Sequence, residues 1–451
     1  MRGLLAFALL LCSATAFAAP HEVPLAPARV DALGALRIGD SVAIDDFPDG
    51  YGGRASLRFT RIDVAAPGAR LVALGPDGEH ELPRSTRIEL IGRDAGDQVR
   101  AQLAFDPGFR NVGGAGSGPS GPFAISARTD ARGTQLVVQP ADEALPKGVV
   151  PQVLPDDASV MGLGTPPDAL PLSSLGGRAP AAGPRGALIA VDVDKELLVN
   201  RFGGTGASNV SAASNWIADL FATMNVMYVR DLDVQLMQGT TIFRTSATPY
   251  AIAADAPANG TDLNNFGNYW QANHAAVDRD FALLLSGRIT GGFSASGVAW
   301  INSYCNKNGN GGSYSVNKVF TSSQVPVDLS ARIVGHELGH NFGAAHTHCT
   351  NAANGATWPV ASNTIDVCYS GEAGAGCYGG AVSCPTAGPQ HPLGTLMSYC
   401  NVSAQNGGAG CGQNALQFHP TQITTLLGYI ASHTPACLSA TADQIFRNGF
   451  D

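Results

Sequence analysis

The most informative stretch of this chain is His336-Glu337-Leu338-Gly339-His340-Asn341-Phe342-Gly343-Ala344-Ala345-His346. His336 and His340 are four residues apart, so on a helix they project from one face and can bind the same metal ion. Glu337 follows the first of them and can reach a water molecule held by that ion. The pattern therefore predicts a metal site on a helix.

The end of the stretch supplies a third ligand. Gly343 can adopt the left-handed conformation that ends a helix and turns the chain, which brings back His346. Three neutral imidazoles with one open position are the ligand set of a catalytic zinc ion rather than a structural one. We therefore expect His336, His340 and His346 to bind one catalytic Zn²⁺; a helix with merely solvated histidines is the alternative. His348 is expected at the surface or behind the ligands.

Composition excludes some classes of partner. The chain has 451 residues, a net charge of −9 and 14% charged residues. This length allows two or three domains, each with a sizeable core. Lys and Arg form no run, so we expect no nucleic-acid partner. The sequence leaves calcium binding and the oligomeric state open.

Residues 1–19 have the features of a secretory signal peptide. Arg2 gives the positive start, Leu4 to Leu11 form the apolar core, and Ala16-Phe17-Ala18 is a small-residue cleavage pattern. The apolar run is too short to span a membrane, and no run of spanning length follows it. We therefore expect a secreted protein without a membrane span.

The cysteines agree with export. Cys12 leaves with the signal, unless a lipid is attached to it, and eight cysteines remain in the second half of the chain. In an exported protein this even number predicts up to four disulfides, whose connectivity the spacing leaves open. A cysteine-bound metal is the weaker alternative, because no Cys-x-x-Cys pair occurs. The eight are Cys305, Cys349, Cys368, Cys377, Cys384, Cys400, Cys411 and Cys437.

The remaining chain divides by composition into four segments. Residues 20–150 alternate apolar and polar positions between Gly, Pro and Asp, which predicts a β-rich domain. Residues 151–186 are rich in Pro, Gly and Ala and indicate a linker. Residues 187–437 are expected to form the main ordered domain, and 438–451 a short tail.

Within 187–437, apolar patterns predict a mixture of strands and helices, and thus an α+β fold. The zinc helix is expected to begin near Asp328, with Asp328 or Ser330 as its N-cap. The expected strands are 187–193, 234–237, 241–245, 281–285 and 297–303, and the other helices 208–230, 262–274 and 420–431.

A methionine turn lies downstream, in Gly394-Thr395-Leu396-Met397-Ser398-Tyr399-Cys400. Together with the extended histidine motif it resembles the metzincin clan of zinc endopeptidases. The resemblance implies a catalytic domain with a twisted mixed sheet, long helices, a zinc helix and a Met-turn. It also implies that Met397 packs beneath the metal as an apolar floor and does not ligate it.

Within this clan, residues 187–437 are most similar to the reprolysin (adamalysin) family. The stretch Gly297-Val298-Ala299-Trp300-Ile301-Asn302-Ser303-Tyr304-Cys305 resembles its substrate-side edge strand, and helix 216–230 its first long helix. Thr347 departs from animal-type members, which usually have Asp there. Tyr399 follows the turn methionine by two residues, as in astacins and serralysins. A bacterial-type reprolysin fits both features.

The resemblance implies a zinc-dependent endopeptidase that acts on proteins or peptides. A zinc-activated water attacks the peptide bond, Glu337 is the general base, and the Tyr399 hydroxyl assists at the developing oxyanion. A purely structural role is the alternative for Tyr399. Substrate would lie extended along Gly297, Val298 and Ala299 and add main-chain hydrogen bonds to the sheet edge.

Under the same resemblance the region 20–185 becomes a propeptide. Many relatives silence the zinc with a prodomain cysteine, but after signal removal this chain has none before Cys305. Latency then needs another ligand or steric cover, with processing expected near Arg178 or Arg185. The resemblance also implies a disulfide between Cys305 and Cys437.

Two other functions compete with this interpretation. One is a catalytically silent binding protein with a metzincin fold, against which the intact Glu337 and the three histidines argue. The other is a zinc amidase that acts on cell-wall peptides. Activity on unfolded protein, compared with activity on peptidoglycan, distinguishes the amidase from the endopeptidase.

Overall fold

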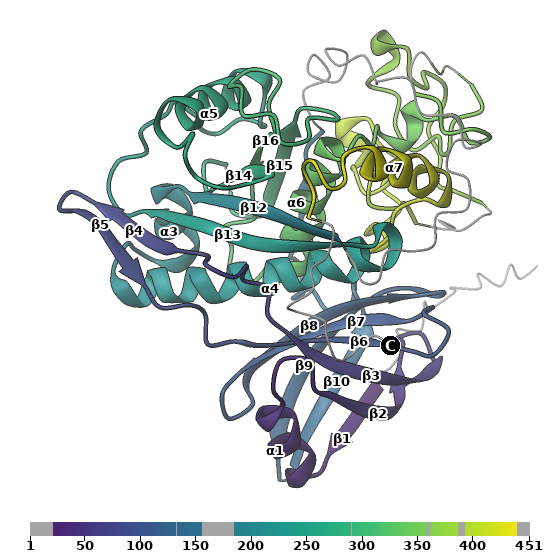
Figure 1. Ribbon diagram of the computed structural model, residues 1–451. Helices are drawn as coiled ribbons and strands as arrows, with labels where there is room; N and C mark the ends of the chain where they lie inside the picture. Colours follow the sequence, from purple (N-terminus) through teal and green to yellow (C-terminus); the bar gives the residue numbers. More distant parts are fainter. Residues whose placement is uncertain are drawn as a thin grey trace, which may run out of the picture.

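The computed structural model describes residues 21–131, 133–155, 185–289, 291–357, 360, 362–386 and 393–439 (Figure 1). The predicted signal peptide, most of the predicted linker and nearly all of the predicted tail lie outside these residues. The described chain forms an N-terminal antiparallel β domain followed by a mixed α+β domain, as expected. Among the described helices, none has the length and apolar character needed to cross a membrane.

The N-terminal sheet of the described chain has eight strands, each antiparallel to its neighbours. Its two outermost strands, β1 and β2, approach each other, so the sheet curls into a nearly closed barrel. Alternate residues such as Leu57 and Phe59 point into the barrel core. The order is β1 (His21–Leu25), β10 (Gly133–Pro140), β9 (Gly121–Asp130), β8 (Arg110–Gly118), β7 (Arg100–Asp106), β6 (Ile88–Arg93), β3 (Arg54–Ile62) and β2 (Ser41–Pro48), and α1 (Pro27–Ala35) follows β1.

The second sheet is mixed. Its central strand β12 is parallel to both neighbours, β13 and β14, whereas β15 is antiparallel to β16. β12 contains the continuous apolar run 187–191 and is largely buried, as is typical of a central parallel strand. The order is β11 (Gln152–Val153), β15 (Ser294–Ala299), β16 (Tyr314–Lys318), β14 (Phe281–Ser286), β12 (Arg185–Val193), β13 (Val234–Arg244), β4 (Leu71–Gly75) and β5 (Gly78–Leu82).

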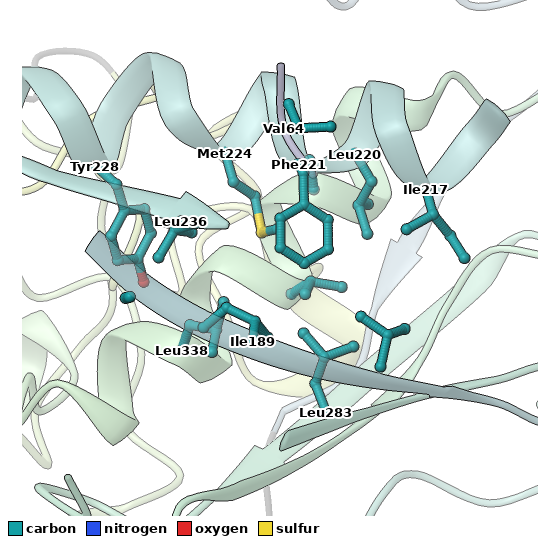
Figure 2. Packing of buried hydrophobic residues seen from close by; sticks show 14 of the residues in the cluster. Val64, Ile189, Ile217, Leu220, Phe221, Met224, Tyr228, Leu236, Leu283 and Leu338 are labelled. Carbon is teal, nitrogen blue, oxygen red and sulfur yellow. The ribbon is translucent and has the colours of Figure 1, made fainter. Parts of the chain in front are cut away.

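Helices cover both faces of this second sheet. α4 (Ala207–Leu232) and α6 (Val327–Asn341) pack on one face, and α5 (Gly260–Asn273) packs on the other (Figure 1). Apolar residues of α4 recur at three- and four-residue spacing and point toward β12 and α6, as Figure 2 shows. They are Ile217, Leu220, Phe221, Met224 and Tyr228. α3 (Lys195–Phe202) and α7 (Pro420–Ser432) complete the regular helices of the described chain.

Between α6 and α7 the described chain has little regular structure, namely η2 (Thr347–Cys349), η3 (Ala373–Ala375) and η4 (Ala404–Asn406). Disulfides crosslink this region, and the sulfur atoms in them are therefore not available as thiolate ligands of a metal. The Cys305–Cys437 pair implied by the resemblance is confirmed, and it ties the turn after β15 to the chain after α7. The other pairs are Cys349–Cys377, Cys368–Cys400 and Cys384–Cys411.

The expected N-cap of the zinc helix is wrong. α6 begins at Val327, its N-cap is Pro326, and no side chain caps it. Asp328 lies in the first turn, where its carboxylate pairs with Arg332 one turn further along, at 3.3 Å. The carboxylate is thus engaged by a buried cation and does not cap the backbone.

Two expected strand boundaries also differ. β15 ends at Ala299 rather than at 303, and beyond it the chain turns, with left-handed backbone conformations at Asn302 and Cys305 (φ of 52° and 48°). The Asn302 N–H donates to the His340 carbonyl, so the turn is anchored on the zinc helix. The two strands expected at 234–237 and 241–245 form one strand, β13, and the irregularity in its pairing with β12 lies between Ile189 and Val191.

N-terminal residues supply both outer strands of the second sheet. β4 and β5, inside the stretch expected to form a separate β-rich domain, extend the sheet through parallel pairing of β4 with β13. β11, inside the predicted linker, pairs in parallel with β15 at the opposite edge. The Arg87 guanidinium also donates two 2.8 Å hydrogen bonds to the Asp219 carboxylate on α4. The two parts therefore share a sheet and a partly buried ion pair.

Candidate metal centre

The structure brings the three predicted ligands together. His336 and His340 lie one turn apart on α6, and His346 follows the end of that helix. Their Nε2 atoms lie 3.1 to 3.2 Å from one another, and all three rings are buried. A single ion could therefore contact all three nitrogens.

The turn after α6 depends on Gly343, as predicted. Gly343 has a φ of 102°, and its N–H donates to the His340 carbonyl at 2.8 Å. A Cβ atom here would also lie 2.7 Å from Cδ2 of Tyr429. Glycine is thus required both for the backbone conformation and for the close approach of α7. The turn places His346 opposite the two helical ligands.

The opposite nitrogen of each ring fixes its tautomer. Nδ1 of His336 lies 2.8 Å from the Leu396 carbonyl oxygen, and Nδ1 of His340 lies 2.7 Å from the Ala344 carbonyl oxygen. Nδ1 of His346 lies 2.8 Å from a carboxylate oxygen of Glu372. These oxygens only accept hydrogen bonds, so Nδ1 carries the hydrogen, and Nε2 of each neutral ring carries a lone pair.

The donor set fits zinc. Three lone pairs directed at one point repel each other unless a cation lies between them. Tetrahedral zinc with Zn–N bonds of about 2.0–2.1 Å sets its ligand nitrogens about 3.3 Å apart. The observed 3.1 to 3.2 Å between the Nε2 atoms is close to that separation. His336, His340 and His346 would therefore hold the ion.

Glu337 lies between the zinc helix and the edge strand β15. Its side chain is buried, and a Cβ atom added to Gly297 would lie 2.2 Å from its Oε1 atom. The missing side chain at Gly297 therefore creates the space that the carboxylate occupies. Glu337 also lines a pocket with His336 and Tyr399, so its carboxylate faces the same cavity as one ligand.

The Met-turn packs beneath and beside the histidines. Met397 is fully buried, and a Cβ atom at Gly339 of α6 would lie 2.6 Å from its sulfur. The Tyr399 ring lies 4.2 Å from the His346 ring and 5.8 Å from the His336 ring, measured between centroids. Met397 thus supports the helix between two ligands, and Tyr399 contacts two ligand rings directly.

Comparison with known proteins decides the family. Residues 185–407 match the family model Reprolysin_5, described as metallo-peptidase family M12. This part of the chain belongs to metallopeptidase family M12. No curated protein matches the chain. The M12 family implies zinc, in agreement with the donor set of the three histidines.

The sequence predicted no role for Glu372, and it left His348 either at the surface or behind the ligands. His348 is fully buried, and its Nε2 donates to the carboxylate of Glu372 at 2.7 Å, so it lies behind the ligands and not at the surface. Burial raises the pKa of the Glu372 carboxyl, but the hydrogen bonds that it accepts from His346 and His348 outweigh burial and hold that pKa well below its usual range. The sequence signal that could have pointed to Glu372 is the small number of acidic residues near the ligands, since Asp366 and Glu372 are the only ones between 347 and 437.

The predicted substrate residues lie beside Glu337, and the chain from the N-terminal part lies next to them. Gly297, Val298 and Ala299 form the end of β15. Just before them, Phe293 and Ala295 accept main-chain hydrogen bonds from the Gln152 and Leu154 N–H groups at 2.7 and 2.9 Å. Val153 and Leu154 line the same pocket as Glu337. The M12 domain thus has its β15 edge partly covered.

Gly297→Ala should lower the peptidase activity of the M12 domain by about 100-fold, because the new methyl group displaces the Glu337 carboxylate by an ångström or more. Bound zinc should stay at one equivalent, since no histidine moves. The measurement is kcat/KM on a peptide, with zinc content by metal analysis. Gly113→Ala in β8, where a Cβ atom meets nothing within 4 Å, is the matched control. Equal kcat/KM for both variants would contradict the prediction.

Proposed function

We propose that this protein is a secreted zinc-dependent endopeptidase. The observation that carries the proposal is the convergence of three histidine Nε2 atoms, with the Glu337 carboxylate in the adjoining pocket. Membership of the M12 family supports peptide-bond hydrolysis. The four disulfides support an oxidising compartment, and hence export.

Different groups of the site have different roles in the proposed hydrolysis. Zinc, when bound, supplies the Lewis acid that polarises the scissile carbonyl. Glu337 takes the proton of the attacking water at its carboxylate and then passes that proton to the leaving amine. The buried position of Glu337 against Gly297 limits its motion. The N–H and C=O groups of β15 align an extended substrate beside this carboxylate.

Replacing Glu337 by Ala or Gln should lower proteolysis of casein by at least about 100-fold, because a general base typically contributes that much or more. Removal of zinc with a chelator should have the same effect, and added zinc should restore activity to the unchanged protein. The exposed Glu81→Ala in β5 is the matched control.

The outcome separates the candidate functions. Loss of casein cleavage in both treatments supports the endopeptidase. Absence of activity after removal of residues before 186 would favour the silent binding protein, provided that the shortened chain is folded and binds one equivalent of zinc. Cleavage of peptidoglycan peptides without cleavage of casein would favour the amidase.

For Tyr399 we propose a catalytic role in addition to its packing. Its ring lies against two ligand rings, which places the side chain at the edge of the reaction pocket. If its hydroxyl donates to the oxyanion, Tyr399→Phe should lower kcat by about 100-fold with unchanged KM and zinc content. Steady-state kinetics measure this change. An unchanged kcat would leave Tyr399 with packing alone.

We further propose that the region before residue 186 is a propeptide that acts by steric cover. β11 occupies part of the β15 edge at which substrate would bind, and Leu154 reaches the pocket of Glu337. Apolar residues of the segment that contains β11 pack against α6 and against the chain that precedes α6. The packed residues are Leu145, Val149, Val153, Phe320, Val325, Leu329 and Ile333. This cover needs no prodomain cysteine.

Gln152→Pro should raise the activity of the uncleaved chain severalfold. The substitution removes the N–H that donates to Phe293, and one such bond contributes about 1 kcal/mol. Gln152→Ala keeps the N–H and is the matched control. The assay is peptide cleavage by the full chain, with N-terminal sequencing to confirm that it is uncleaved. Full activity of chains that begin at residue 19 or 20 would contradict the propeptide.

A further inference from the structure

A single carboxylate oxygen serves two buried histidines behind the metal centre. Oε2 of Glu372 lies 2.8 Å from Nδ1 of His346 and 2.7 Å from Nε2 of His348. Glu372 is 3% exposed, and both rings are fully buried. The two imidazole rings are nearly parallel, with 13° between their planes and 5.2 Å between centroids. Glu372 therefore joins the third ligand, His346, to a second buried histidine, His348.

The third ligand is held differently from the other two. His336 and His340 belong to α6, and backbone carbonyls accept from their Nδ1 atoms. His346 lies beyond the helix, directly before the short η2 turn. Its Nδ1 hydrogen bond goes to a side chain, so the orientation of its ring depends on where Glu372 lies.

Glu372 is itself fixed by the loop that carries it. The N–H of Ala375 donates to the Glu372 carbonyl at 2.9 Å, and the N–H of Tyr378 donates to the His348 carbonyl at 3.0 Å. The Cys349–Cys377 disulfide links the residue after His348 to the segment that follows Glu372. The two backbone hydrogen bonds and the disulfide thus fix the segments that carry Glu372 and His348.

We propose that Glu372 is a positioning residue for zinc, which orients His346 and increases the basicity of its Nε2 atom. A carboxylate that accepts from the far nitrogen of a ligand histidine fixes the tautomer and makes the ring a better donor to the metal. His348 completes the arrangement because it occupies the same oxygen from the other side. This inference rests on the proposed zinc function of the three histidines.

The test is zinc affinity, measured on the full chain by competition with a chromophoric chelator. Glu372→Gln keeps the size of the side chain but removes the charged acceptor, and it should bind zinc about 10- to 100-fold more weakly. Glu372→Asp keeps the carboxylate on a shorter chain and should fall between Gln and the unchanged protein. Glu89→Gln is the matched control, because Glu89 is also buried and accepts from a side-chain amide, Nε2 of Gln102, at 3.0 Å.

A second measurement separates positioning from a merely structural role. The thermal unfolding midpoint of the zinc-free protein should be nearly the same for Glu372→Gln and the unchanged chain. Zinc affinity within about twofold of the unchanged protein would overturn the inference. A zinc-free midpoint that falls sharply, with no recovery of affinity in Glu372→Asp, would also overturn it. If the unchanged chain itself binds no zinc, the proposed function fails first, and this result is distinct from the other two.

Discussion

The close approach of three imidazole Nε2 atoms places the strictest demand on the fold of this protein. Atoms carrying lone pairs do not remain 3.1 to 3.2 Å apart unless the protein holds them there for a cation. The fold does this through the opposite nitrogens, whose acceptors are Ala344, Leu396 and Glu372. These belong to the turn after α6, the Met-turn and the loop before η3. The ligand geometry therefore exists only when all three segments are in place.

Covalent bracing compensates for the scarcity of regular structure in these segments. The Cys349–Cys377 and Cys368–Cys400 disulfides close loops of the chain between the zinc helix and the Met-turn. Such closure stabilises a fold by restricting the unfolded chain. Asp366, inside the first loop, accepts from the Ser398 hydroxyl at 2.7 Å, and just before that loop the Thr347 N–H donates to the Met397 carbonyl at 3.1 Å. The loops and the Met-turn thus form one unit around the histidines.

The second sheet takes both of its outer strands, β11 and β5, from N-terminal residues. An open sheet edge presents unpaired main-chain groups and promotes association with other chains. At the β15 edge the same open groups are what an endopeptidase needs to align its substrate. In the proposed zymogen, β11 therefore protects this edge and blocks it at the same time. At the opposite edge the β4–β5 hairpin pairs with β13, away from the zinc helix.

The features of this protein that follow from local residue spacing could be predicted from the sequence. The helical positions of His336 and His340 and the left-handed turn at Gly343 were predictable, because a helix repeats every 3.6 residues and glycine tolerates positive φ. Contacts between segments far apart in the chain became visible only in the folded protein. Glu372 reaches His346 only through the folding of an irregular, disulfide-braced loop, which has no periodicity to read. The assignment of β4 and β11 to the second sheet was likewise not predictable, since strand partners far apart in the chain are chosen by packing and main-chain hydrogen bonds rather than by local composition.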